Sequence, residues 1–102
     1  MDELVQLMSK ALADTFALYL KSHNFHWNVK GPNFPQYHSF LGDLYDELHG
    51  AVDPIAEHIR TLDAFAPGSM VRYLALTSIV ENNAEISAAE MFTQLQADNQ
   101  TV

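Results

Sequence analysis

Cysteine is absent from the 102 residues, and cationic residues are scarce. The missing thiols exclude disulfides and thiolate zinc sites, and their absence is typical of a cytoplasmic protein. Five Lys and Arg residues stand against thirteen Asp and Glu, which gives a formal net charge of −8. The cations are scattered and neither end carries a basic tail. Direct DNA binding depends on clustered cations and is therefore not expected.

Long apolar runs are also missing. No run approaches the roughly 18 residues that a membrane-spanning helix needs, so we expect no membrane partner. The first residues, Met1-Asp2-Glu3, lack the basic and apolar regions of a signal peptide, which again favours the cytoplasm. Apolar residues make up 48% of the chain, enough for one globular domain over residues 1–102. A domain this small buries a modest fraction of its surface, and association with another copy would extend its hydrophobic core.

Apolar residues recur at three- and four-residue steps, which predicts an all-α fold. A first helix is predicted from residue 2 to about residue 29, where Lys30-Gly31-Pro32-Asn33 forms a turn. A second helix follows, with Asn33 as its cap, and continues to about Leu62. Because so short a turn joins them, the two long helices must lie antiparallel.

Two further helices are predicted beyond the hairpin. A loop over residues 63–69 precedes a short helix from Met70 to Val80. The last helix begins at Ala88, after a capping box formed by Ser87 and Glu90, and continues to the end of the sequence. The predicted architecture is a long antiparallel hairpin, a short helix and part of a third long helix.

Two histidines and two acids have spacings that suit a metal site. His26 lies at the end of the first predicted helix and His38 near the start of the second, so the turn brings them together. Asp53 and Glu57 are four residues apart and share one helix face. Imidazole and carboxylate ligands suit Fe(II), Mn(II) or Zn(II) better than copper(I).

The helix length separates these two pairs within one chain. At about 1.5 Å per residue, Asp53 lies about 22 Å and Glu57 about 28 Å along the helix from His38. The two pairs of one chain therefore cannot share a metal ion. If the second helices of two copies cross antiparallel about a two-fold axis near residues 46–48, each histidine pair faces the other chain's acids. The geometry predicts at least a dimer with two identical sites.

Other roles remain open for these residues. A histidine at a helix end is often a cap or a surface residue, and an acid pair on a helix often faces solvent. Three neighbouring aromatic residues are predicted core residues: Trp27, Phe34 and Tyr45. Three more histidines could support the site or add a ligand to it: His23, His49 and His58.

The chain resembles the Dps family, the mini-ferritins, over roughly residues 4–102. The similar segments are His26-Trp27-Asn28-Val29-Lys30-Gly31-Pro32-Asn33-Phe34, His38, and Asp53-Pro54-Ile55-Ala56-Glu57-His58-Ile59. The resemblance implies a ferritin-like four-helix subunit that assembles into a shell of twelve. It also implies a ferroxidase that oxidises Fe(II) with hydrogen peroxide or oxygen and stores the ferric mineral.

The same resemblance implies roles for individual residues. His26 and His38 would bind iron together with Asp53 and Glu57 of a two-fold mate, and Trp27 would take up oxidising equivalents beside the site. At Gly42 the family usually has an acid, so a second, weaker iron position should suffer. The family's basic N-terminal arm is absent, and the sequence stops within the third long helix, which predicts an incomplete four-helix bundle.

The sequence therefore predicts an iron-binding ferroxidase that protects against peroxide damage, with zinc or manganese as substitute metals. One alternative is a structural Dps-like assembly protein without catalysis, which Gly42 favours. Another is a module that holds zinc or manganese without redox turnover.

Overall fold

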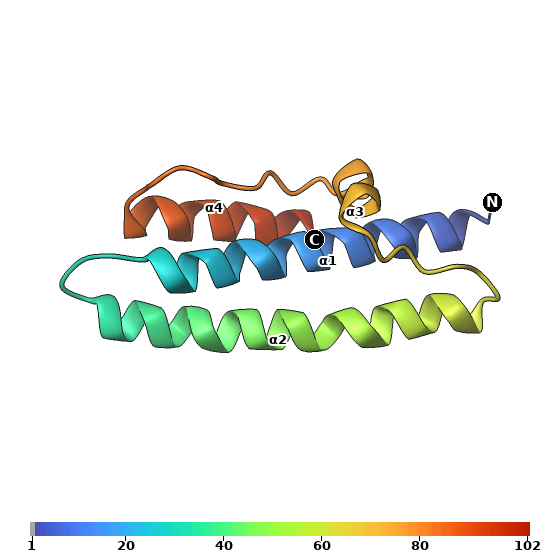
Figure 1. Ribbon diagram of the computed structural model, residues 1–102, viewed down its shortest axis with the longest axis horizontal. Coiled ribbons are helices and arrows are strands. Elements are labelled where there is room, and N and C mark those ends of the chain that lie inside the picture. Colours follow the sequence, from blue (N-terminus) through green and yellow to red (C-terminus); the bar gives the residue numbers. More distant parts are fainter. Residues whose placement is uncertain (1) are drawn as a thin grey trace.

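The computed structural model describes residues 2–102, which form four helices. These are α1 (Glu3–Asn28), α2 (Phe34–Thr61), α3 (Met70–Leu76) and α4 (Ala88–Thr101). Residues 2–102 contain no strand, so the all-α prediction is confirmed. Figure 1 shows α1 and α2 as a long antiparallel hairpin within an elongated molecule of 49 × 22 × 21 Å. No helix in this part of the chain is long and apolar enough to cross a membrane.

The ends of the long helices follow the local sequence signals. α1 begins after Asp2, whose Oδ1 accepts a hydrogen bond from the Leu4 backbone nitrogen at 3.1 Å. Gly31 has a φ of 113°, in the left-handed region that favours glycine, and it turns the chain between the helices. Asn33 precedes α2 but makes no capping bond with its side chain. The predicted position of the cap is therefore confirmed, but its side chain does not contribute the capping hydrogen bond.

The core lies where α2 and α4 pack on α1. One cluster of buried residues joins all three helices: Leu18, Phe25, Val29, Leu41, Met91 and Leu95. A second cluster lies at the other end of the hairpin: Val5, Leu12 and Ile59. Leu12 and Leu41 are fully buried, and each such side chain stabilises the fold by about 1.5–3 kcal/mol. This packing holds the two long helices in a fixed register.

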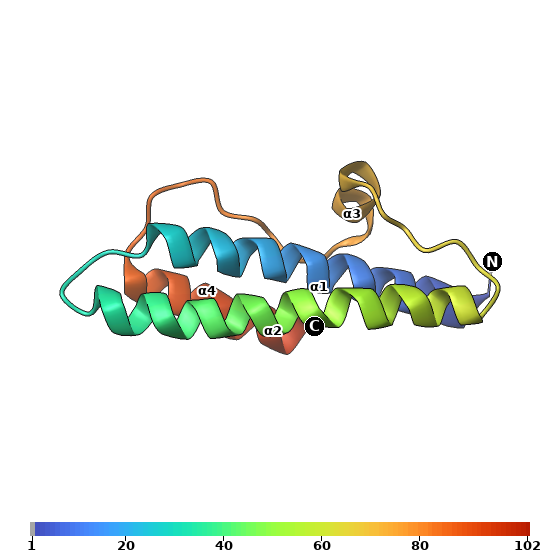
Figure 2. The same ribbon diagram turned by 60° about the horizontal axis from the view of Figure 1, so that its bottom comes forward.

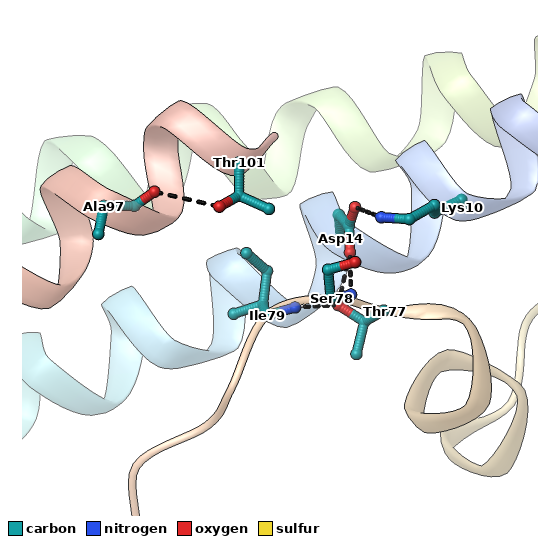
Figure 3. A network of polar contacts seen from close by, with 7 residues as sticks. All are labelled: Lys10, Asp14, Thr77, Ser78, Ile79, Ala97 and Thr101. Carbon is teal, nitrogen blue, oxygen red and sulfur yellow. Dashed lines mark hydrogen bonds and ion pairs between the residues drawn. The ribbon is translucent and has the colours of Figure 1, made fainter.

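The short helix α3 ends at Leu76, four residues before the predicted end at Val80. The buried carboxylate of Asp14 explains the difference. Its Oδ1 accepts hydrogen bonds from the Thr77 hydroxyl and the Ser78 backbone nitrogen, both at 2.7 Å (Figure 3). Thr77 adopts an extended conformation, with ψ 146°, to reach this acceptor. A contact across 63 residues thus overrides the local helical periodicity.

A buried lysine attaches the last helix to the first. Lys21 is only 5% exposed, and its Nζ lies 2.7 Å from both the Val80 carbonyl oxygen and Asp98 Oδ2. The second view shows α4 along the C-terminal half of α1, with its own end near the middle of that helix (Figure 2). α4 begins as predicted, because Ser87 Oγ accepts a bond from the Glu90 backbone nitrogen at 3.2 Å.

Candidate metal centre

His26 and His38 lie in contact at the closed end of the hairpin. Their ring centroids are 3.7 Å apart, and the two planes are inclined by 22°. Nδ1 of His26 lies 2.7 Å from the backbone oxygen of His38. Nδ1 of His38 lies 2.8 Å from the backbone oxygen of His26. The hairpin therefore brings the two side chains together and binds each of them to the other residue's main chain.

This exchange of hydrogen bonds fixes the tautomer of both rings. A carbonyl oxygen only accepts hydrogen bonds, so each Nδ1 must carry the hydrogen and donate it. In a neutral imidazole, Nε2 then keeps its lone pair. Metal-binding histidines commonly have this arrangement, in which a carbonyl or carboxylate holds the other ring nitrogen. Both rings are thus oriented as potential nitrogen ligands before any metal arrives.

Gly42 makes room for one of these rings. A Cβ at residue 42 would lie 3.1 Å from Cε1 and 3.3 Å from Nδ1 of His26. These distances are tighter than ordinary van der Waals contact, so a side chain there would push the ring by a few tenths of an ångström. The glycine therefore has a packing role in this chain, as well as lacking the carboxylate expected from the family resemblance.

Further aromatic rings extend from the histidine pair along α1 and α2. His23 stacks on Tyr45 with a centroid distance of 3.8 Å and an interplanar angle of 7°. The Tyr19 hydroxyl lies 3.0 Å from Nδ1 of His23. Burial lowers the pKa of His23, and the nearby His26 and His49 lower it further. A lowered pKa keeps this imidazole neutral near pH 7, which limits positive charge beside a cation site.

The aromatic residues beside the turn do not all lie in the core. Trp27 is 58% exposed, and its ring lies 4.0 Å from that of His23. Phe34 is 39% exposed and stacks on the His38 ring at 4.9 Å. The core prediction is therefore wrong for both, because no helix in the described part of the chain covers them at this end of the hairpin. Tyr45 is half-buried, between His23 and Tyr19.

The acid pair lies on the exposed surface of α2. A side-chain hydrogen bond between Glu57 and Asp53, which the protonated Glu57 carboxyl donates, raises the pKa of Glu57, and the charge of Asp53 and slight desolvation add to the effect. Two ionised carboxylates repel each other, so the pair retains a proton to higher pH than a single glutamate would. A divalent cation relieves the same repulsion. Adjacent, solvent-facing carboxylates of this kind can serve as oxygen ligands.

One chain does not complete a metal site by itself. Within residues 2–102, no three His, Asp or Glu side chains gather closely enough to hold a metal ion. The histidine pair lies at the closed end of the hairpin, and the acid pair lies farther along α2. The length of helix between His38 and Asp53 keeps the two pairs apart within one chain. The other two histidines of α2, His49 and His58, are exposed, and the His49 ring packs on the Tyr19 ring at 4.8 Å. The hydrogen-bond exchange and the Gly42 contact have no signal in the sequence, because both depend on how the helices pack.

Comparison with known proteins gives the family. The model of the ferritin-like domain matches residues 5–102. The chain is 37% identical to the DNA protection during starvation protein of Brevibacillus brevis, over 90% of this chain and 62% of that protein. It is 36% identical to antigen TpF1 of Treponema pallidum, over 93% of this chain. The chain spans about half (54%) of the length of that antigen.

Solved structures agree with this assignment. The crystal structure of TpF1 superposes with a TM-score of 0.91 at 36% identity, over 95% of this chain and 63% of that one. A Dps protein of Vibrio cholerae, described as a member of the ferritin-like diiron-carboxylate proteins, gives a TM-score of 0.92 at 26% identity, over 97% of this chain and 62% of that one. With its helical hairpin and matching segments, the chain belongs to the ferritin-like family and, within it, to the Dps proteins.

Proposed function

We propose that the protein binds Fe(II) between two copies of the chain and oxidises it with hydrogen peroxide or oxygen. His26 and His38 of one copy supply nitrogen ligands, and Asp53 and Glu57 of the other supply carboxylates. The observation that carries the proposal is the reciprocal hydrogen bonding of His26 and His38, which leaves both Nε2 atoms free to bind a metal. Trp27 is close enough to take up oxidising equivalents, since its ring packs on His23, one helical turn from His26.

The donor set fits Fe(II), which is the substrate in this proposal. Borderline imidazole nitrogen and hard carboxylate oxygen together suit Fe(II), and they also accept Zn(II) and Mn(II). The main-chain carbonyl groups hold the imidazole rings in place, so little ordering remains when the ion binds. The acid pair brings negative charge, which favours a cation and more so the higher charge of the oxidised ion. Below the raised pKa of Glu57, binding displaces a proton from the acid pair.

Replacing both His26 and His38 by Ala tests the proposal. We expect Fe(II) oxidation, followed by stopped-flow absorbance after mixing with peroxide, to fall to the rate of iron without protein. The matched control is His58→Ala, because His58 is exposed on α2 and makes no ring contact within the described residues. A double variant that oxidises iron as fast as the parent chain would show that the site is assigned to the wrong residues.

The missing carboxylate at residue 42 favours the alternative of a purely structural protein. Iron titration separates this alternative from a ferroxidase. Saturable Fe(II) binding at one or two ions per chain supports the ferroxidase, and no saturable binding supports the scaffold. Metal analysis of protein purified without added metal tests for resident zinc or manganese.

DNA is not among the proposed partners, because the five cations are scattered over an acidic chain. A gel-shift assay at low salt should show no retarded DNA.

A further inference from the structure

On the exposed face of α2, the spacing of the residues that concern the proposed site is symmetric about the middle of the helix. Six of the residues on this face have successive spacings of four, four, three, four and four: His38, Gly42, Asp46, His49, Asp53 and Glu57. At about 100° per residue, all six fall within a sector of about 100° around the helix. The last four are exposed, and the first two are half-buried. We call these six residues the palindromic stripe.

The palindromic stripe borders the side of α2 that packs on α1, and three of its residues touch α1 side chains at that border: His38, Gly42 and His49. The buried residues Leu41 and Ile59 lie on the packed side, about 110° around the helix from the centre of the stripe. Glu47 points away from both, about 130° from the centre of the stripe, and is exposed. α2 therefore has one face for its own core, one for solvent, and between them a stripe whose three acids are exposed.

An antiparallel two-fold axis between residues 47 and 48 pairs the stripe with itself. His38 then faces Glu57 of the second copy, and Gly42 faces Asp53 of that copy, as the proposed metal site requires. The same operation places Asp46 opposite His49 of the second copy, twice per dimer. Each of these pairings is neutral or complementary in charge, and none sets like charges against each other.

We propose that Asp46 of one copy pairs with His49 of the other across the two-fold axis of the proposed intersubunit site. The inference rests on the intersubunit site proposed above and adds a contact that takes no part in binding iron. Asp46 and His49 are both exposed, and Asp46 has no ion pair within the described residues, so both side chains can reach a second chain. The His49 ring also contacts the Tyr19 ring of its own chain. The two contacts fix the register of the helices. The register decides whether each histidine pair meets the acids of the other copy.

Mixing two variants of opposite charge tests the pairing directly. One chain carries Asp46→Lys and the other carries His49→Glu. The His49→Glu homodimer sets the introduced glutamate against Asp46 twice, and the Asp46→Lys homodimer loses both Asp46–His49 pairs. The heterodimer sets the introduced lysine against the introduced glutamate and keeps one Asp46–His49 pair. Native mass spectrometry after subunit exchange counts the three dimers. Random pairing gives equal total amounts of heterodimer and homodimers, and we expect about a tenfold excess of heterodimer, decreasing at high salt.

The control mixes the parent with Glu47→Lys, a change of the same kind on the solvent face, and should give random pairing. Contacts between residues 46 and 49 within one chain are the same in every dimer, so they cannot produce the excess.

A second measurement uses the absence of cysteine. Asp46→Cys and His49→Cys chains, mixed and oxidised, should form a disulfide-linked heterodimer that neither forms with the Glu47→Cys chain.

The outcomes separate this inference from the proposed function. Random pairing of the charged variants in a dimeric protein overturns the Asp46–His49 contact and leaves the ferroxidase proposal standing. Selective pairing without iron oxidation by the parent supports the contact and overturns the ferroxidase. A parent chain that stays monomeric in solution, with and without iron, overturns both.

Discussion

Gly42 lies directly against the His26 ring, so that a Cβ at residue 42 would come within 3.1 Å of the ring carbon Cε1. The close approach means that the missing side chain and the position of the histidine are coupled. The family resemblance alone suggests that an acid is simply absent at this position. In the structure, the His26 ring donates a hydrogen bond to the His38 carbonyl oxygen and occupies the space that a side chain at residue 42 would need.

We expect Gly42→Ala to slow Fe(II) oxidation several-fold, because the new methyl group displaces the His26 ring. Its effect on the free energy of unfolding should be small, since the gain of about 1 kcal/mol from replacing a helical glycine offsets the crowding. Histidine ¹⁵N resonances report the ring tautomers, and urea melts report stability. Gly50→Ala is the control for stability: a Cβ there meets nothing within 4 Å, so a gain of about 0.5–1 kcal/mol is expected. Equal gains with unchanged histidine resonances would contradict the coupling.

Asp14→Asn should destabilise the protein and change its acid unfolding. Burial by itself would raise the pKa of Asp14, but hydrogen bonds from Lys10, Thr77 and Ser78 outweigh it and lower the pKa. A carboxyl with a lowered pKa stabilises the fold fully above its unfolded pKa of about 3.9, and the contribution is lost as the pH falls through the folded pKa.

We expect Asp14→Asn to cost about 1–3 kcal/mol at pH 7 and to flatten the stability curve below pH 4. Chemical denaturation from pH 2 to 7 measures both effects. A variant as stable as the parent at pH 7 would show that the Asp14 contacts do not hold the segment after α3.

The buried ion pair between Lys21 and Asp98 should respond unequally to the loss of either partner. The Lys21 side chain is 3% exposed and that of Asp98 is 15% exposed. Asp98→Ala leaves a buried cation with only the Val80 carbonyl, and we expect a loss of about 3 kcal/mol. Lys21→Met should cost less, because water can still reach Asp98. The double variant should regain most of the loss, and thermal unfolding of all four proteins measures the cycle.

Metal binding should weaken as the pH falls through the raised pKa of Glu57. The hydrogen bond to Asp53 and the charge of that residue favour the protonated pair, so that below the raised pKa a cation must displace a proton. Calorimetric titration with redox-inert Zn(II), in buffers of different ionisation enthalpy, measures the protons released. The contribution of the pair to folding stability depends on pH in the opposite direction. The raised pKa means that the pair's contribution to stability is complete below the unfolded pKa of glutamate and is lost as the pH rises through the folded pKa.

Asp53→Asn removes the repulsion and should return the pKa of Glu57 towards its ordinary value. The proton release of Glu57 should then disappear, together with most of the affinity for metal. If the variant binds Zn(II) with the parent's affinity and pH dependence, Asp53 is not a ligand.

The sequence by itself determined the helices of the hairpin and the meeting of His26 and His38. These features depend on local information: apolar periodicity, a glycine that permits the turn, and a connection too short for any arrangement but an antiparallel one. The distance from His38 to Asp53 and Glu57 also follows from the sequence, because an α-helix has a fixed rise per residue. The proposal that a second chain completes the site therefore follows from the sequence and helix geometry.

Only the tertiary structure decided which groups face each other across elements. Asp14 ends α3 at Leu76 because it draws Thr77 and Ser78 into hydrogen bonds, a long-range contact that periodicity does not encode. The exposure of Trp27 depends on which side of the hairpin α4 covers. The tautomers of His26 and His38, and the use of Gly42 as space for a ring, depend on ångström-scale helix packing. Local sequence sets helix lengths and faces, whereas the orientation of a ligand atom depends on contacts between residues far apart in the chain.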